Sequence, residues 1–321
     1  MYSLGIDLGG TKTALGLVSQ KGELIKESRF PTSRNGFSQY CKELITHIHD
    51  FLGQETVYAI GVGCAGQIEL GSGTIFHSPN LGWTNAPLGA ELRKAFLGIP
   101  VCVDNDVRAS TLGEYLFGNH KNPQSFVNVF LGTGIGSGII LNQRFLRGAS
   151  NSAGEIGHTT LNMYGPKAPS HNHGVYEYYA SGTALTRLGQ EWYLKSRNNH
   201  PLVEKFKIRC AEEITGPMIG ELAMDGNQEA MRIIRQIGIH AGAGIVNVIN
   251  LLNPEVITYG GGLTDLGDML IRPMIQTIEE RAIPTALRAV TLKKAVLGNQ
   301  APLLGSAHLY RIDSSGKILN S

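Results

Sequence analysis

Three glycine-rich clusters are the residues of this 321-residue chain best suited to chemistry on a phosphate. The first is Asp7-Leu8-Gly9-Gly10-Thr11-Lys12, the second is built around Gly132-Thr133-Gly134, and the third is Gly260-Gly261-Gly262. Glycine lets backbone amides approach a phosphate closely, and a carboxylate can hold magnesium through water. Each cluster alone is weakly specific, because a plain hairpin turn has the same composition. Together they indicate a phosphate-binding site.

The clusters do not match the two most common phosphate loops. The pattern GxxxxGK[ST] is absent, and the glycines at 132–138 do not open a helix as a GxGxxG nucleotide loop must. We therefore interpret the first two clusters as hairpin turns that contact phosphate. Thr11 and Thr133 are the candidate phosphate contacts, and Asp7 is a candidate for holding Mg²⁺ through water. The triple glycine would let a nucleotide's base and ribose lie against bare backbone.

The elements that must position these clusters follow one pattern twice. A glycine-turn hairpin is followed by a helix and a strand in both halves of the chain. The first half predicts strands at 3–8, 13–19, 23–30, 57–63 and 101–103, and helices at 37–52, 87–96 and 105–117. The second half predicts strands at 126–131, 135–141 and 256–259, and a long helix at 228–252. The stretch between 63 and 87 is interpreted as rich in loops.

Composition excludes several classes of protein. Hydrophobic residues make up 42% and charged residues 17%, which is ordinary for a soluble globular protein. The net charge is +2 without a basic run, so nucleic acid is not an expected partner. The sequence has no apolar stretch of about 18 residues and no signal-peptide pattern, which predicts no membrane association and a cytoplasmic protein. The dispersed cysteines Cys41, Cys64, Cys102 and Cys210 show no metal or redox spacing.

The motifs, taken in order, resemble a known superfamily. Asp7 to Lys12, Asn105-Asp106, the Thr133 loop and the triple glycine are similar to the phosphate, connecting and adenosine motifs of the actin/hexokinase/Hsp70 ATPases. Two further segments resemble the signature of the ROK family, named for repressors, open reading frames and kinases. These segments are Gly154-Glu155-Ile156-Gly157-His158 and Glu177-Tyr178-Tyr179-Ala180-Ser181-Gly182. The resemblance extends from Gly5 to about Tyr310.

This resemblance implies an α/β protein with the two-lobed actin-like ATPase (ribonuclease H-like) fold. The expected core is a duplicated arrangement of hairpin and helix around a central cleft. The first lobe is expected over 1–118 and the second over 119–301. A C-terminal helix at about 302–312 is expected to pack back on the first lobe.

The resemblance also implies an activity, the ATP-dependent phosphorylation of a free hexose, and a role for each matching residue. Asp106 matches the general base that accepts the proton of the sugar hydroxyl. The residues matching the sugar contacts are Asn80, Asn105, Glu155, His158 and Glu177. The residues matching the MgATP site are Asp7, Gly9, Gly10, Thr11, Lys12, Gly132, Thr133, Gly134, Gly260, Gly261 and Gly262. From the residues alone, Asn105 and Asp106 could instead be ordinary caps of their helix.

One departure from the family concerns zinc. Many ROK proteins bind zinc through the histidine of the first signature and three cysteines before the second glutamate. Ala168, Ser170 and Val175 stand at those cysteine positions, so no zinc is expected. A three-histidine site of His158, His171 and His173 is the less favoured alternative.

The substrate and the competing functions complete the expectations. The segment Pro79-Asn80-Leu81-Gly82-Trp83 with Pro87-Leu88 resembles glucokinases, so glucose is the first candidate. N-acetylmannosamine and N-acetylglucosamine are the alternatives, and fructose is less favoured. A ROK repressor would need a DNA-binding domain before Asp7, and a catalytically silent sugar sensor is the other rival. A homo-oligomer is expected, most simply a dimer. Trp83 is expected either beside the sugar or as an interface or core residue.

Overall fold

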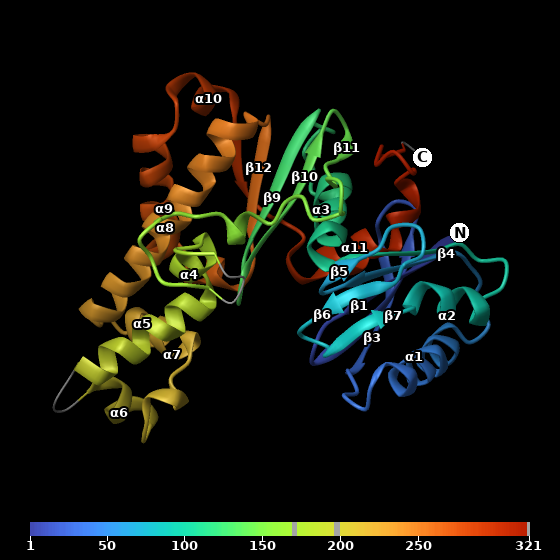
Figure 1. Cartoon of the computed structure of the whole chain (residues 1–321), viewed down its shortest axis with the longest axis horizontal. Helices are drawn as coiled ribbons and strands as arrows, with labels where there is room; N and C mark the ends of the chain where they lie inside the picture. The colour runs from blue at the N-terminus through green and yellow to red at the C-terminus, as the bar shows by residue number, and fades with distance from the viewer. Residues whose placement is uncertain (169–171, 196–199, 320–321) are drawn as a thin grey trace. The chain divides into compact units, whose positions relative to one another are not determined.

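The computed structural model describes residues 1–168, 172–195 and 200–319, and the chain divides into two compact units (Figure 1). Unit 1 consists of Met1–Asn128, Ser137–Gly154 and Ala295–Ser321. Unit 2 consists of Val129–Gly136 and Glu155–Lys294. Each unit therefore gathers segments that are far apart in the sequence.

The central sheet of unit 1 has the strand order β3-β2-β1-β4-β8. Its strands are β1 (Tyr2–Leu8), β2 (Lys12–Ser19), β3 (Leu24–Pro31), β4 (Val57–Cys64) and β8 (Val101–Asn105). The first three form an antiparallel meander, while β4 and β8 run parallel to β1. In this register Asp7 lies opposite Gly63, and Asn105 lies opposite Cys64. The carboxyl ends of β1, β4 and β8 thus meet at one edge, as parallel strands require.

Successive side chains of β1 point to opposite faces of this sheet, and different helices cover the two faces. Leu4, Ile6 and Leu8 are fully buried and pack in one apolar core with α1 (Phe37–Leu52) and α2 (Leu88–Ala95). The opposite face is covered by α11 (Ala301–Ala307), which packs on β1, β4 and α3 (Asp106–Phe117) (Figure 1). Asp7 alternates onto the α11 side, the same side as α3.

The stretch between 63 and 87, interpreted as rich in loops, also contains strands that the sequence did not indicate. It contains a small antiparallel sheet of β5 (Gln67–Ile68), β6 (Ile75–Ser78) and β7 (Trp83–Ala86). Strands of two to four residues are too short to show alternation in a sequence. The C-terminal helix predicted at about 302–312 is shorter than expected, since α11 ends at Ala307 and a 3₁₀ turn follows at Leu309–Arg311. The other predicted helices and strands are confirmed to within two residues at each end.

A second sheet has the order β11-β10-β9-β12-β13. Its strands are β9 (Ser125–Leu131), β10 (Ile135–Leu141), β11 (Arg144–Phe145), β12 (Val256–Gly260) and β13 (Thr291–Lys294). The α-helices of unit 2 are α4 (Tyr176–Ala180), α5 (Gly182–Lys195), α6 (Pro201–Phe206), α7 (Gly216–Met224), α8 (Gln228–Leu252), α9 (Asp268–Arg281) and α10 (Pro284–Ala289). The 3₁₀ turns are η1 (Ile156–His158), η2 (Ala211–Glu213), η3 (Gly262–Leu266), η4 (Gly298–Gln300) and η5 (Leu309–Arg311).

The helix α8 is the longest element of unit 2 and runs beside α9 (Figure 1). Its first turn is capped by Asn227, whose side chain accepts a hydrogen bond from the Ala230 amide, and it ends at Asn253 in the left-handed conformation. The residues that the sequence placed on one face of this helix are buried. None of the helices in the described part of the chain is long and apolar enough to span a membrane.

Candidate functional site

Two carboxylates lie near each other where β1 ends and α3 begins. Asp7 pairs with Gly63 across the sheet, and a Cβ built on Gly63 would lie 3.4 Å from the Cα of Asp106. Burial, reinforced by the negative charge of Asp106, raises the pKa of Asp7 to about 6. Burial also raises the pKa of the Cys64 thiol well above its ordinary value, and both carboxylates add to that effect. We call Asp7 and Asp106 the acidic pair.

Asn105 caps α3 and is held on every polar atom of its side chain. Its Oδ1 accepts hydrogen bonds from the amides of Val107 (3.0 Å) and Arg108 (3.3 Å), and its Nδ2 donates to the carbonyl oxygen of Gly66 (3.2 Å). The capping interpretation therefore applies to Asn105. Asp106 Oδ1 also accepts from the Val107 amide, at 3.0 Å, which orients this carboxylate at the first turn of α3.

The first glycine turn and Asn80 come together at the same edge of the sheet. The Gly9 amide donates to the Lys12 carbonyl (3.1 Å), and the Thr32 hydroxyl donates to the Gly9 carbonyl (2.8 Å). A Cβ on Gly10 would lie 2.9 Å from the Asn80 carbonyl oxygen, so these two backbones are in contact. Thr11, Lys12 and Asn80 are exposed. Unit 1 thus contains the first glycine turn, two predicted sugar contacts (Asn80 and Asn105) and the acidic pair.

The second and third glycine clusters lie side by side in unit 2. Gly261, with φ of 95°, packs on the end of β9, and a Cβ there would lie 2.6 Å from the Leu131 carbonyl oxygen. The start of α5 is tied to the same turn, because the Gly182 amide donates to Gly132 and the Thr183 amide donates to Thr133 (2.7 and 3.1 Å). The two clusters that the sequence separates by more than a hundred residues therefore form one surface.

This surface borders a pocket of about 670 Å³, within the range of small-molecule sites. Its lining residues are Gly132, Thr133, Gly182, Thr183, Leu185, Thr186, Thr215, Gly216, Pro217, Gly220, Met224, Gly262, Leu263, Asp265 and Leu266. Five of these, on α7 and the residue before it, were not anticipated: Thr215, Gly216, Pro217, Gly220 and Met224. The only sequence signal was the Thr-Gly-Pro start of a helix, which is also an ordinary helix N-terminus.

Glu155, His158 and Glu177 all belong to unit 2. Glu155 and His158 are exposed at the two ends of η1. Glu177, on α4, accepts a hydrogen bond through Oε2 from the Ile135 amide at 2.8 Å. One of its carboxylate oxygens therefore holds the second glycine turn. The sequence did not indicate this structural contact of a predicted sugar residue.

The segment at the family's zinc positions is held by hydrogen bonds around Asn172. Its Nδ2 donates to the His158 carbonyl (2.9 Å), its backbone carbonyl accepts from the Ala168 amide (2.7 Å), and its Oδ1 accepts from the His173 amide (2.8 Å). Ala168 and Val175 are buried, and neither side chain can ligate a metal. Ser170 and His171 lie outside the described residues. Within the described ranges no three His, Cys, Asp or Glu side chains converge to hold a metal.

Trp83 belongs to the core of unit 1 and does not lie on an open surface. Only 4% of it is exposed, and its ring packs against Tyr40 and Phe37 at centroid distances of 5.0 and 5.4 Å. Of the two positions expected for this residue, the structure therefore selects the core.

Three comparisons with known proteins bear on this site. Residues 3–312 match the profile of the ROK family. The glucokinase of Streptomyces coelicolor is 32% identical over 316 residues, which cover 96% of this chain and 97% of that one. A putative xylose repressor of Caldicellulosiruptor sp. is 30% identical over 94% of this chain, but the match covers 76% of the repressor.

Among solved structures, a ROK family glucokinase from Streptomyces griseus in complex with glucose and AMPPNP superposes with a TM-score of 0.81. The sequence identity is 29%, and the match covers 96% of this chain and 99% of that one. The actin-like ATPase fold expected from the sequence is therefore confirmed.

Proposed function

Because the chain belongs to the ROK family, we propose that it is an ATP-dependent kinase that phosphorylates a hydroxyl group of a free hexose. The observation that carries this proposal is the acidic pair at the carboxyl edge of the first sheet, beside the first glycine turn. A protein that only binds sugar has no need of two half-buried like charges side by side. A kinase needs one carboxylate for the proton and another for the metal.

We assign the nucleotide to the pocket of unit 2. Thr133 and the glycines of its turn are suited to phosphate oxygens, because exposed backbone amides and a hydroxyl can donate to them. The apolar and small residues from α7 and η3 are suited to the adenosine part, which needs flat contact with few charges. Asp265 and the threonines of the lining provide the polar groups that fix its orientation.

Asp106 is the proposed general base. As the sugar oxygen attacks the γ-phosphorus, the bond from phosphorus to the β,γ-bridging oxygen breaks, and the hydroxyl proton passes to the Asp106 carboxylate. Its place at the first turn of α3, with Oδ1 held by the Val107 amide, fixes the direction from which it accepts that proton. Removing such a base typically costs a factor of about 10²–10⁴ in rate.

The sugar contacts we propose are Asn80 and Asn105 in unit 1, and Glu155, His158 and Glu177 in unit 2. Carboxylate, amide and imidazole groups can each bind a pair of neighbouring hydroxyls. Glu177 has one oxygen on the Ile135 amide, so its other oxygen is the one available to a hydroxyl. The same carboxylate would then contact both the sugar and the phosphate turn.

Magnesium fits the donor set of unit 1. Hard oxygen ligands suit it, and a cation would favour the ionised form of Asp7, whose pKa is raised by burial and by the charge of Asp106. Asp7 would hold the ion through water, and the ion would neutralise charge on the ATP phosphates. Lys12 and Arg29 contribute the nearby positive charge, and both lower the pKa of Asp7.

Glucose is the substrate we propose first. Its support is the full-length similarity to the Streptomyces coelicolor glucokinase and to a glucokinase solved with glucose. N-acetylmannosamine and N-acetylglucosamine remain the alternatives, since the same set of side chains could bind them. The similarity to a xylose repressor means that family membership alone does not decide between catalysis and sugar sensing.

The test is a coupled assay of MgATP consumption with glucose, N-acetylmannosamine, N-acetylglucosamine, mannose and fructose. The parent should turn over at least one sugar. Asp106→Asn should lower kcat by about 10²–10⁴ while the sugar Kd, measured by calorimetry, changes by only a few-fold. If the parent binds a sugar without consuming ATP, the silent-sensor function replaces this one.

A further inference from the structure

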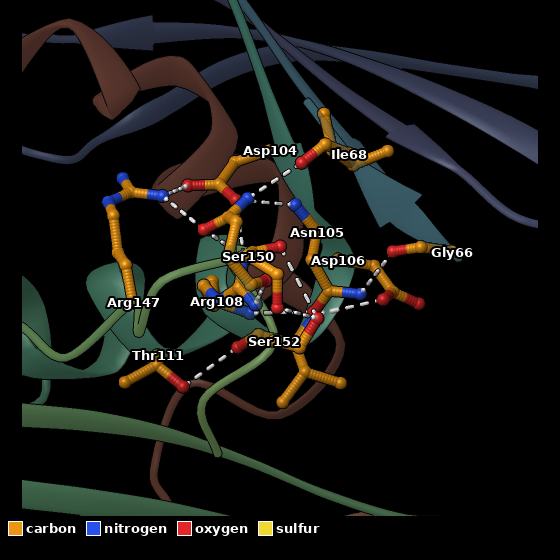
Figure 2. Close-up of polar contacts among 12 residues, drawn as sticks. Gly66, Ile68, Asp104, Asn105, Asp106, Arg108, Thr111, Arg147, Ser150 and Ser152 are labelled. Atoms are coloured by element: carbon orange, nitrogen blue, oxygen red, sulfur yellow. Dashed lines mark hydrogen bonds and ion pairs between the residues drawn. The ribbon is translucent and has the colours of Figure 1, made fainter. Parts of the chain in front are cut away.

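Two arginines of unit 1 converge on a carboxylate directly before the Asn105-Asp106 turn (Figure 2). Arg108 Nη1 lies 3.1 Å from Asp104 Oδ1, and Arg147 Nη1 lies 2.7 Å from Asp104 Oδ2. Asp104 and Arg108 are only 3% and 5% exposed. Buried ion pairs often add little to stability compared with apolar packing, so their value is more often geometric. The contacts of this ion pair with the neighbouring backbone therefore indicate its role.

Asn151 joins the same ion pair from a loop that follows Arg147. Its Oδ1 accepts from Arg108 Nη1 (2.8 Å) and from Arg147 Nη1 (3.2 Å), and its backbone carbonyl accepts from Arg108 Nη2. Its Nδ2 donates to the Ile68 carbonyl at 2.8 Å. The backbone of Asn151 has φ of 57°, a conformation that asparagine adopts more readily than most residues. The loop is thus folded so that this side chain points into the ion pair.

These contacts fix the backbone of the turn from several directions. The Asn105 amide donates to Asp104 Oδ1 at 2.8 Å, so the two arginines orient the carboxylate that holds Asn105 (Figure 2). The Asn105 side chain donates to the Gly66 carbonyl, and Asn151 binds the backbone two residues further on, at Ile68. Asn105 is therefore held through its own amide, through its side chain and through the strand that it contacts.

The same loop leads into the next predicted sugar residue. The Ala153 amide donates to the Arg147 carbonyl (3.0 Å), and the Ser137 hydroxyl donates to the Gly154 carbonyl (2.7 Å). Glu155 follows directly in the chain. The backbone before Glu155 is therefore fixed by the loop that carries Asn151.

We propose that Asp104, Arg108, Arg147 and Asn151 form a turn clamp that positions Asn105 and Asp106 for the sugar, with Arg108 as its central positioning residue. This inference rests on the proposed function for the roles of Asn105 and Asp106. The clamp acts on the sugar side of the reaction, because the turn that it holds carries a proposed sugar contact and the proposed general base, and none of its four residues lines the pocket assigned to the nucleotide. A displacement of about 1 Å at a reacting group can cost about 10²-fold in rate.

The test variant is Arg108→Met, and the matched control is Arg93→Met. Methionine keeps much of the apolar stem of Arg108, and Asp104 retains Arg147, so no buried charge loses its last partner. Arg93 also donates to two backbone carbonyls, those of Val101 and Ser72, but Val101 is at the other end of β8. Each variant therefore removes an arginine that contacts β8, one near the turn and one at the other end of the strand.

Arg108→Met is expected to lower kcat/KM for the sugar by about 10–100-fold and to leave the KM for MgATP within two-fold. Arg93→Met should leave both within two-fold. Arg108→Lys should recover part of the loss, since an ammonium can reach Asp104 but cannot bridge to Asn151 with the same geometry. Asn151→Gly, which accepts the same backbone conformation, should resemble Arg108→Met.

Amide hydrogen exchange gives a readout that needs no turnover. Exchange at residues 105–108 should rise at least ten-fold in Arg108→Met and Asn151→Gly and stay unchanged in Arg93→Met. Unchanged exchange there, or equal loss of sugar kcat/KM in both arginine variants, would overturn the clamp. Failure of the proposed function would show differently, as a parent protein that phosphorylates no sugar.

Discussion

Asp7 is the residue whose environment most constrains the chemistry. A carboxyl group with a pKa of about 6 binds a proton more readily in the folded chain than in the unfolded chain, where its value is near 3.8. Between these two pH values the folded state holds more protons, so stability falls as the pH rises through this window. At neutral pH the ionised Asp7 is therefore a cost to the fold, which a bound cation would offset.

Replacement of Asp7 by asparagine should separate stability from activity. In the absence of magnesium, Asp7→Asn should be more stable than the parent by about 1–3 kcal/mol at pH 8, and the difference should vanish below about pH 4. Magnesium-dependent turnover should be lost. Urea unfolding at several pH values measures the first effect, and the coupled assay measures the second. Asp50→Asn, an exposed carboxyl on α1, is the control and should show neither effect.

At the scale of elements, α4 is positioned by a close contact with α8. The Tyr176 ring is fully buried, and its hydroxyl donates to the Ala241 carbonyl at 2.8 Å. A Cβ on Gly244 would overlap this ring. The absence of a side chain at Gly244 is thus what lets α4 lie on α8 and present Glu177, the next residue after Tyr176.

Gly244→Ala should lower the free energy of unfolding by about 2–4 kcal/mol. Replacing glycine by alanine in the middle of a helix normally raises the free energy of unfolding by about 0.5–1 kcal/mol. A decrease would therefore identify the contact with Tyr176 as its cause. Chemical denaturation measures the change, and Tyr176→Leu in the same chain should relieve part of it. A stabilised Gly244→Ala variant would contradict this account of the α4–α8 packing.

How far the sequence predicts the structure also depends on the element. Amphipathic helices such as α1 and α8, and strands bounded by glycine turns, can be predicted from the periodicity of their apolar residues. Contacts between distant segments do not. Nothing in the sequence indicates that Glu177 holds the Ile135 amide, or that Asn151 reaches Asp104 through two arginines. Motifs in the sequence identify the candidate site residues, whereas only the structure shows which residues hold them in place.

At the scale of the whole molecule, the pocket that we assign to the nucleotide is lined only by residues of unit 2. A nucleotide should therefore bind and stabilise the protein before any sugar is present. At a hundred times its Kd, a ligand that binds only the folded state adds about 2.7 kcal/mol. Binding should also be detectable at individual segments, because four short segments of the chain line the pocket.

A non-hydrolysable ATP analogue with magnesium should slow amide exchange in residues 132–134, 182–186, 215–220 and 262–266. These are the segments that line the pocket. Inorganic phosphate is the control, because it lacks the adenosine part and should leave 215–220 unprotected. If the full nucleotide left residues 215–220 unprotected, the adenosine would bind elsewhere. That result would contradict the assignment of the nucleotide to this pocket.

The position of α11 has a consequence for how the chain folds during its synthesis. The strands of the first sheet precede unit 2 in the sequence, yet one face of this sheet is covered by a helix that follows the whole of unit 2. At roughly 5–20 residues per second, a ribosome needs on the order of ten to forty seconds to add what lies between them. Throughout that interval the nascent sheet lacks α11 on this face and presents a surface for a chaperone. Unit 1 can thus be completed only after the whole of unit 2 has been synthesised.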